Sequence, residues 1–144
     1  MPYDGTSPQK SDKVHNILQG CADYLDSPRN GWATHVHQNA ARARCLVGIV
    51  GHVASDCSAQ AFQSQAPNAY TNKALAVMYS AFKELYPTIE RDVRERFLGF
   101  SGKWLTEQCL ISFNNNNKRE HVHAVFKQAV VLYEQEQLVA SDGS

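Results

Sequence analysis

The chain has 144 residues, of which 43% are hydrophobic and 19% are charged, a balance typical of a globular rather than a disordered protein. A chain of this length fits a single domain and buries about 70% of its unfolded surface, so folding requires neither a metal nor disulfides. The 14 basic and 14 acidic residues cancel. This argues against a general nucleic-acid-binding protein, because such domains are strongly basic.

The sequence contains no segment expected to target or cross a membrane. Residues 1–10 form a polar arm without the apolar stretch of a signal peptide. The longest apolar run, Cys45–Gly51, is far shorter than the about 20 residues that span a bilayer. We therefore expect a cytoplasmic protein with no membrane association. The cysteines lie far apart without a Cys-x-x-Cys pair and are expected to be free thiols; they are Cys21, Cys45, Cys57 and Cys109.

The first predicted helix follows the polar arm. Ser11 is the expected N-cap, with Asp12 favourable in the first turn. The residues Ser27–Gly31 end the helix, because the position before a proline disfavours helical geometry. Apolar residues at spacings of three and four predict that one face is buried: Val14, Ile17, Leu18, Cys21 and Leu25.

The next stretch divides into a loop and an ambiguous apolar segment. Residues 31–40 lack a helical period and are expected to form a loop, with a short extended segment near residues 32–38. Residues 41–54 are compatible with a buried strand or a buried helix. We favour the helix, in which Gly48 and Gly51 would let another helix approach closely.

Three further elements are expected before the asparagine run. Residues 56–70 are rich in Ser, Gln and Ala and predict a loop, after which Thr71 or Asn72 caps a helix that ends at Pro87. A shorter helix is expected from Thr88 to about Phe97. The segment from Trp104 to Ile111 is compatible with a helix or an extended piece.

Four consecutive asparagines, Asn114–Asn117, predict a loop that leads into the last helix. Asn117 and Glu120 have the spacing of a capping box. The apolar positions that follow repeat at helical spacing; they are Val122, Phe126, Ala129, Val130 and Tyr133. Residues 139–144 are expected to fray. The sequence thus predicts a mostly α fold, a compact bundle of about four to five helices forming one domain over residues 11–138.

The order of these features resembles a family of uncharacterised small proteins of actinobacteria and bacteriophages, domain of unknown function 6197. Gly31-Trp32 matches the first motif of that family, and Cys45-Leu46-Val47-Gly48 matches the second. Phe113-Asn114-Asn115 stands where the family has Trp-Asn-Asp, so Asn115 cannot supply the charge of an aspartate. The resemblance implies a compact helical fold and a phage or mobile-element origin, and it implies no activity.

Histidines are the first candidates for metal binding. In an extended segment, His35 and His37 would project to the same side, an acceptable geometry for two metal ligands. A zinc site would need a third ligand, such as His52, Cys57 or His121. Solvent-exposed or hydrogen-bonded histidines are the more common outcome, so no metal or other cofactor is expected.

Nucleophilic cysteine chemistry has weaker support. Cys45 precedes a helix-like segment, and Cys57 follows His52 by five residues. A reactive thiol needs a lowered pKa from a helix N-terminus or a nearby cation. Cys21, Cys45 and Cys109 lie on apolar stretches, which favours buried, inert thiols.

The most suggestive set of residues combines an indole, guanidinium groups and carboxamides. An indole offers a stacking face, guanidinium groups bind phosphates, and carboxamides can recognise a base edge. Such a set suits a nucleotide-like ligand or an acidic protein partner; its members are Trp32, Arg42, Arg44, Asn114, Asn115 and Arg119. The alternative places the indole in the core, the arginines in solvent and the asparagines in a turn.

Three functions follow from these observations. The first is a non-enzymatic binding module, for instance a phage or mobile-element accessory (anti-defence-like) protein that sequesters an anionic, nucleotide-like ligand or binds a host protein. The second is a small histidine-dependent hydrolase or nucleotide-directed enzyme that uses the region from His35 to His52. The third is a structural or oligomeric interaction protein. The absence of a known catalytic motif favours the first.

Overall fold

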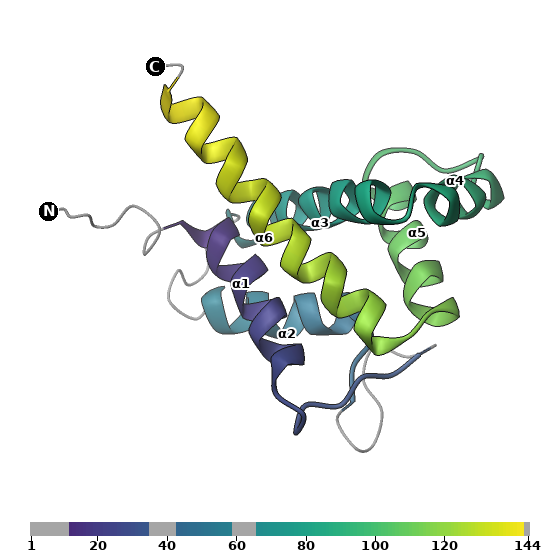
Figure 1. Cartoon of the computed structure of the whole chain (residues 1–144), viewed down its shortest axis with the longest axis horizontal. Helices are drawn as coiled ribbons and strands as arrows, with labels where there is room; N and C mark the ends of the chain where they lie inside the picture. Colours follow the sequence, from purple (N-terminus) through teal and green to yellow (C-terminus); the bar gives the residue numbers. More distant parts are fainter. Residues whose placement is uncertain (1–11, 35–42, 59–65, 143–144) are drawn as a thin grey trace, which may run out of the picture.

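The computed structural model describes residues 12–34, 43–58 and 66–142. These residues form a compact array of six α-helices (Figure 1): α1 (Lys13–Asp26), α2 (Leu46–Ser58), α3 (Ala66–Leu85), α4 (Pro87–Arg96), α5 (Gly102–Asn116) and α6 (Arg119–Asp142). The mostly helical class is confirmed. The count of four to five helices is wrong, because the segment left open between helix and extended structure forms α5.

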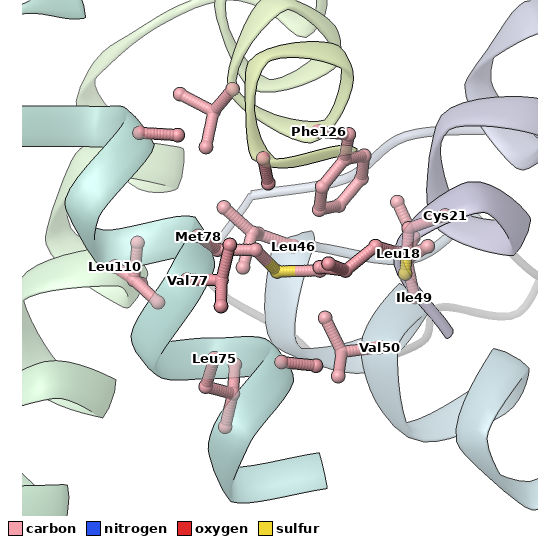
Figure 2. Packing of buried hydrophobic residues seen from close by; sticks show 14 of the residues in the cluster. Leu18, Cys21, Leu46, Ile49, Val50, Leu75, Val77, Met78, Leu110 and Phe126 are labelled. Carbon is pink, nitrogen blue, oxygen red and sulfur yellow. The ribbon is translucent and has the colours of Figure 1, made fainter. Parts of the chain in front are cut away.

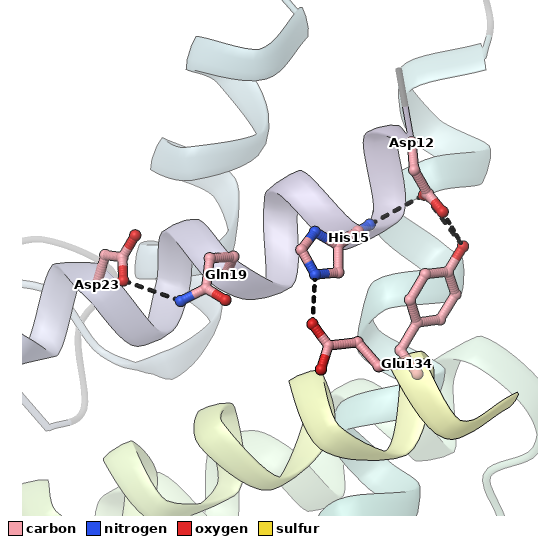
Figure 3. A network of polar contacts seen from close by, with 6 residues as sticks. Asp12, His15, Gln19, Asp23 and Glu134 are labelled. Atoms are coloured by element: carbon pink, nitrogen blue, oxygen red, sulfur yellow. Dashed lines mark hydrogen bonds and ion pairs between the residues drawn. The ribbon is translucent and has the colours of Figure 1, made fainter. Parts of the chain in front are cut away.

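The helices α1 and α6 pack against each other in antiparallel directions. His15 near the start of α1 lies 2.9 Å from Glu134, and Asp26 at the end of α1 lies 2.8 Å from His123 near the start of α6. Figure 3 shows the first of these contacts. At the same end of α1, the hydroxyl of Tyr133 donates to the Asp12 carboxylate. Polar pairs at both ends therefore fix the register of the two helices.

The helix α2 contributes to the centre of the core, as its apolar sequence requires. Leu46 and Ile49 are completely buried. They lie among Leu18 of α1, Met78 of α3 and Phe126 of α6 (Figure 2). The preference for a buried helix at residues 41–54 is confirmed from Leu46 onward, whereas residues 43–45 are not helical and include the bridge residue Arg44.

The apolar stripes expected for the first and last helices are also confirmed. All five stripe residues of α1 and all five of α6 are buried. The close approach between α1 and α2 depends on a glycine of α1, because a Cβ added at Gly20 would lie 2.6 Å from Cγ1 of Val53. Gly51 does not have the packing role expected of it: it is exposed, and an added Cβ would meet nothing within 4 Å.

The predicted starts of α1 and α3 are wrong. The N-cap of α1 is Asp12 rather than Ser11, and its carboxylate accepts a 3.0 Å hydrogen bond from the backbone N–H of His15. The helix α3 starts at Ala66, ahead of Thr71 and Asn72, so the loop predicted over residues 56–70 is helical at both ends. Pro67 falls in the first turn of α3, where the missing N–H costs no helical hydrogen bond.

The asparagine run is helical rather than a loop up to Asn116. The amides of Asn116 and Asn117 donate to backbone carbonyls four residues earlier, at 2.8 and 2.9 Å, and so satisfy groups at the end of the helix. Asn117 is the C-cap of α5, not the N-cap of α6. The backbone N–H of Lys118 donates to Nδ1 of His121, which takes the place expected for Glu120 in a capping box.

Candidate functional site

The side chain of Asn114 joins three segments that are distant in the sequence. Its Oδ1 accepts hydrogen bonds from the indole N–H of Trp32 at 2.6 Å and from the backbone N–H of Leu46 at 2.9 Å. Its amide donates to the carbonyl of Ala33 at 3.0 Å. Asn114 is completely buried on α5, and it holds both the segment Trp32–Ala33 and the start of α2 against that helix.

A single parallel β-bridge pairs Trp32 with Arg44. The backbone N–H of Ala33 donates to the carbonyl of Arg44 at 3.0 Å, and that of Arg44 donates to the carbonyl of Gly31 at 3.1 Å. Gly31 is required there, because an added Cβ would lie 2.7 Å from the Cβ of Ala43. Paired residues on neighbouring strands project to the same face, so the indole and the guanidinium start from one side of the bridge.

Tyr24 of α1 supports the guanidinium of Arg44. One guanidinium nitrogen donates to the phenol oxygen at 3.2 Å, and the guanidinium carbon lies 6.0 Å from the ring centroid, at the limit of a cation–π contact. His52 of α2 meets the same ring edge-on at 5.8 Å. Tyr24 is buried, so the guanidinium of Arg44 rests on a phenol of the core that also contacts the imidazole of His52.

Arg119 has a structural role at the end of α1. Its guanidinium donates to three backbone carbonyls, those of Leu25 at 3.0 Å, Ser27 at 3.0 Å and Asn30 at 2.6 Å. The last carbonyls of a helix have no partner within the helix. The start of α6 thus satisfies the end of α1 and the turn that follows it.

The structure brings most of the predicted ligand-binding residues into one region, with different roles. Trp32 and Arg44 are half-buried and reach the surface, and Asn115 accepts a 3.3 Å hydrogen bond from the amide of Asn114. Asn114 lies beneath them. Arg42, together with the metal-ligand candidates His35 and His37, lies outside the described residues. Ligand binding by these residues stays a prediction.

No pattern in the sequence indicated that Tyr24 is part of this region. It belongs to the buried face of α1, where an aromatic residue at helical spacing indicates packing only. The contact between Tyr24 and Arg44 depends on the position of Arg44, which is set by its β-bridge with Trp32.

The described residues contain no group of three or more side chains suited to hold a metal ion. The described cysteine side chains, Cys21, Cys45 and Cys109, are buried thiols. The sulfur of Cys45 accepts a weak 3.4 Å hydrogen bond from the backbone N–H of Gly48. These thiols have the surroundings expected of core residues.

A buried carboxylate links α3 and α4, away from the predicted site. Glu90 is 2% exposed and accepts hydrogen bonds from the hydroxyl of Tyr79 and from Nε of Arg94, the latter at 2.8 Å. Burial alone would raise the pKa of Glu90, but these hydrogen bonds and the charge of Arg94 hold that pKa below its ordinary value. Burial, reinforced by Glu90, raises the pKa of Tyr79 well above its ordinary value.

Sequence reasoning missed this cluster. The spacing of Glu90 and Arg94 signals only a common surface ion pair on a helix. Burial also raises the pKa of the nearby Cys109 thiol. All these groups are satisfied by one another, so the cluster is best explained as a polar contact that fixes α4 on α3.

The chain belongs to a family of small proteins whose function is unknown. The matching family model, described as a family of unknown function (DUF6197), covers residues 9–131 and confirms the resemblance seen in the sequence. Neither a curated protein nor a solved structure matches the chain significantly. Within the described residues, no helix has both the length and the apolar character needed to cross a membrane.

Proposed function

We propose that this protein is a non-enzymatic binding module that takes an anionic, nucleotide-like ligand at the surface between Trp32 and Arg44. The observation that carries the proposal is the β-bridge between these two residues, which starts an indole and a guanidinium from the same face. An aromatic ring can stack on a base, and a guanidinium can bind a phosphate through two parallel hydrogen bonds.

Preorganisation supports this function over a purely structural role. The indole is pinned by Asn114, and the guanidinium rests on Tyr24. Groups held in place before binding lose less conformational entropy when a ligand arrives.

We also propose that the ligand is sequestered rather than converted. The polar groups grouped around the bridge are suited to stacking, to hydrogen bonding and to charge pairing. An accessory, anti-defence-like role in a bacteriophage or mobile element is the setting that the family resemblance suggested, and a sequestering module fits such a role.

A thermal-shift panel of mononucleotides and cyclic oligonucleotides tests the proposal. A ligand present at 100 times its dissociation constant adds about 2.7 kcal/mol to the free energy of unfolding. Arg44→Gln is expected to abolish the shift, whereas Arg91→Gln, at an exposed position of α4, should keep it. The absence of a shift across the whole panel would contradict the proposal.

Fluorescence gives a second readout at the same surface. The chain has two tryptophans, Trp32 and Trp104. In a Trp104→Phe variant the remaining emission comes from Trp32, and a stacked base is expected to quench it. An unchanged emission spectrum at a ligand concentration that produces a thermal shift would place the ligand elsewhere.

A further inference from the structure

Asn30 is the only asparagine of the chain that precedes a glycine. The side chain of an asparagine can react with the backbone nitrogen of the next residue, and a glycine there has no Cβ to hinder the attack. The pair Asn30-Gly31 is therefore the position of the chain where this reaction is chemically easiest. It lies directly ahead of the β-bridge between Trp32 and Arg44.

Three hydrogen bonds hold Asn30 in the turn after α1, where it is half-buried. Its backbone N–H donates to the carbonyl of Ser27 at 3.2 Å. Its side-chain amide donates to the carbonyl of Tyr24 at 2.9 Å, and its own carbonyl accepts from the guanidinium of Arg119 at 2.6 Å. The side chain is thus bound to α1, and the peptide that contains the nitrogen of Gly31 is bound to α6.

These contacts oppose the reaction, because it needs the side chain to turn toward the next peptide. The bond to Tyr24 restrains the side chain of Asn30, and the bond to Arg119 restrains the peptide between Asn30 and Gly31. The reaction therefore proceeds from molecules in which the turn has opened. Its rate is proportional to the population of that open state, which local contacts reduce.

We propose that Asn30-Gly31 is a site of spontaneous deamidation through a cyclic succinimide, and that Arg119 keeps the reaction slow. The backbone nitrogen of Gly31 loses its proton and attacks Cγ of Asn30, and Nδ2 leaves as ammonia. Water then opens the ring at one of its two carbonyl carbons. Opening at Cγ gives an aspartate. Opening at the former backbone carbonyl carbon gives an isoaspartate, in which the main chain runs through the side chain.

The isoaspartate is incompatible with the bridge, because it adds one atom to the main chain ahead of Gly31. The carbonyl of Gly31 accepts from the N–H of Arg44 at 3.1 Å. On its other side Gly31 has no room to shift, since even an added Cβ would lie 2.7 Å from the Cβ of Ala43. The modification is therefore expected to displace Gly31 and to separate Trp32 from Arg44.

Peptide mapping by mass spectrometry during incubation at mildly alkaline pH tests the protection by Arg119. Val93→Ala removes a buried contact of α4 and is the control for lost global stability. The two variants are compared at urea concentrations that give the same fraction of unfolded chain. There Arg119→Ala is expected to form product at Asn30 about tenfold faster than Val93→Ala. Asn30→Gln removes the site and should give no product at this position.

Fluorescence tests the effect of the modification on the bridge. In a Trp104→Phe background the emission comes from Trp32. The chromatographically separated isoaspartyl form is expected to emit at longer wavelength, because Trp32 loses its hydrogen bond to Asn114 and becomes more exposed. Asn30→Asp supplies the other product with an unchanged main chain, and it should keep the emission of the unmodified protein.

Three results would overturn the proposal. One is an unfolded chain that forms no product at Asn30. Another is an equal rate for Arg119→Ala and Val93→Ala at the same fraction of unfolded chain. The last is an isoaspartyl form with unchanged Trp32 emission. Should Arg119→Ala fail to fold, Arg119→Lys replaces it, and its rate is expected to lie between those of the wild type and the unfolded chain.

Discussion

The indole N–H of Trp32 donates a 2.6 Å hydrogen bond to the side-chain oxygen of Asn114, 82 positions later in the chain. The same oxygen accepts from the first backbone N–H of α2. One buried carboxamide therefore fixes the ring proposed to bind a ligand and caps the helix at the centre of the core. The candidate site and the stability of the fold depend on the same residue.

Asn114→Ala is expected to destabilise the protein by about 3 kcal/mol, because it leaves the buried N–H of Leu46, the buried carbonyl of Ala33 and the half-buried indole N–H without a partner. Urea unfolding measures the loss. Asn116→Ala is the control, since Asn116 is exposed on the same turn of α5, and it should stay within about 0.5 kcal/mol of the wild type. Equal stability of the two variants would show that the buried network contributes little.

The acid stability of the protein should depend on Glu90. The pKa of this carboxyl is lower in the folded protein than in the unfolded chain, where it is about 4.3. The stabilisation is therefore complete above the unfolded pKa and is lost as the pH falls through the folded pKa. Glu90→Gln should show a smaller loss of unfolding free energy between pH 7 and pH 3 than the wild type.

The control for the acid experiment is Glu95→Gln, at an exposed position of the same helix. This variant is expected to lose as much stability between pH 7 and pH 3 as the wild type loses. An acid dependence that Glu90→Gln leaves unchanged would count against the buried carboxylate as its source.

Gly20→Ala tests the close approach of α1 and α2. The added methyl group would lie 2.6 Å from a methyl carbon of Val53, and the expected cost is about 2 kcal/mol. In a Val53→Ala background the space is open, and the same substitution should instead stabilise the helix by about 0.5–1 kcal/mol. A double-mutant cycle by thermal unfolding reports this reversal of sign; a cost that persists in the Val53→Ala background would exclude Val53 as its cause.

The helices whose pattern is local could be predicted from the sequence. The stripe led by Val14 and the stripe led by Val122 are both buried, because an apolar repeat of three and four residues places its members on one face whatever lies opposite. The helix α2 was harder, because its less buried positions carry Val47, Gly48 and Gly51 rather than charged residues, so the sequence has no polar face to set a period.

The asparagines show why the site could be predicted only in part. Turn propensity predicts a loop for this run, but Asn114 is satisfied by Trp32, Leu46 and Ala33, all distant in sequence. The structure places Trp32 in contact with Asn114 and pairs it with Arg44, as their grouping by chemistry predicted, and ligand binding there stays a prediction. Sequence spacing could not show that Asn114 is buried beneath the surface and that Arg119 points to the end of α1, because both facts depend on tertiary packing.

Arg119 should be a major stabilising residue for the contact between α1 and α6. Its guanidinium donates to three carbonyls at the end of α1 and in the following turn, and Arg119→Ala is expected to cost about 2 kcal/mol. Arg119→Lys keeps the charge but not the planar fork that reaches three acceptors, so it should recover only part of the loss.

Hydrogen exchange at single-residue resolution checks this role together with urea unfolding. The amides in the last turn of α1 should lose protection in Arg119→Ala, while those in the middle of α3 change only as far as global stability falls. Lys118→Ala, at the adjacent exposed position, is the matched control and should leave both measurements unchanged. If Arg119→Lys proved as stable as the wild type, charge at the helix end would explain the effect, and the three directed hydrogen bonds would not be required.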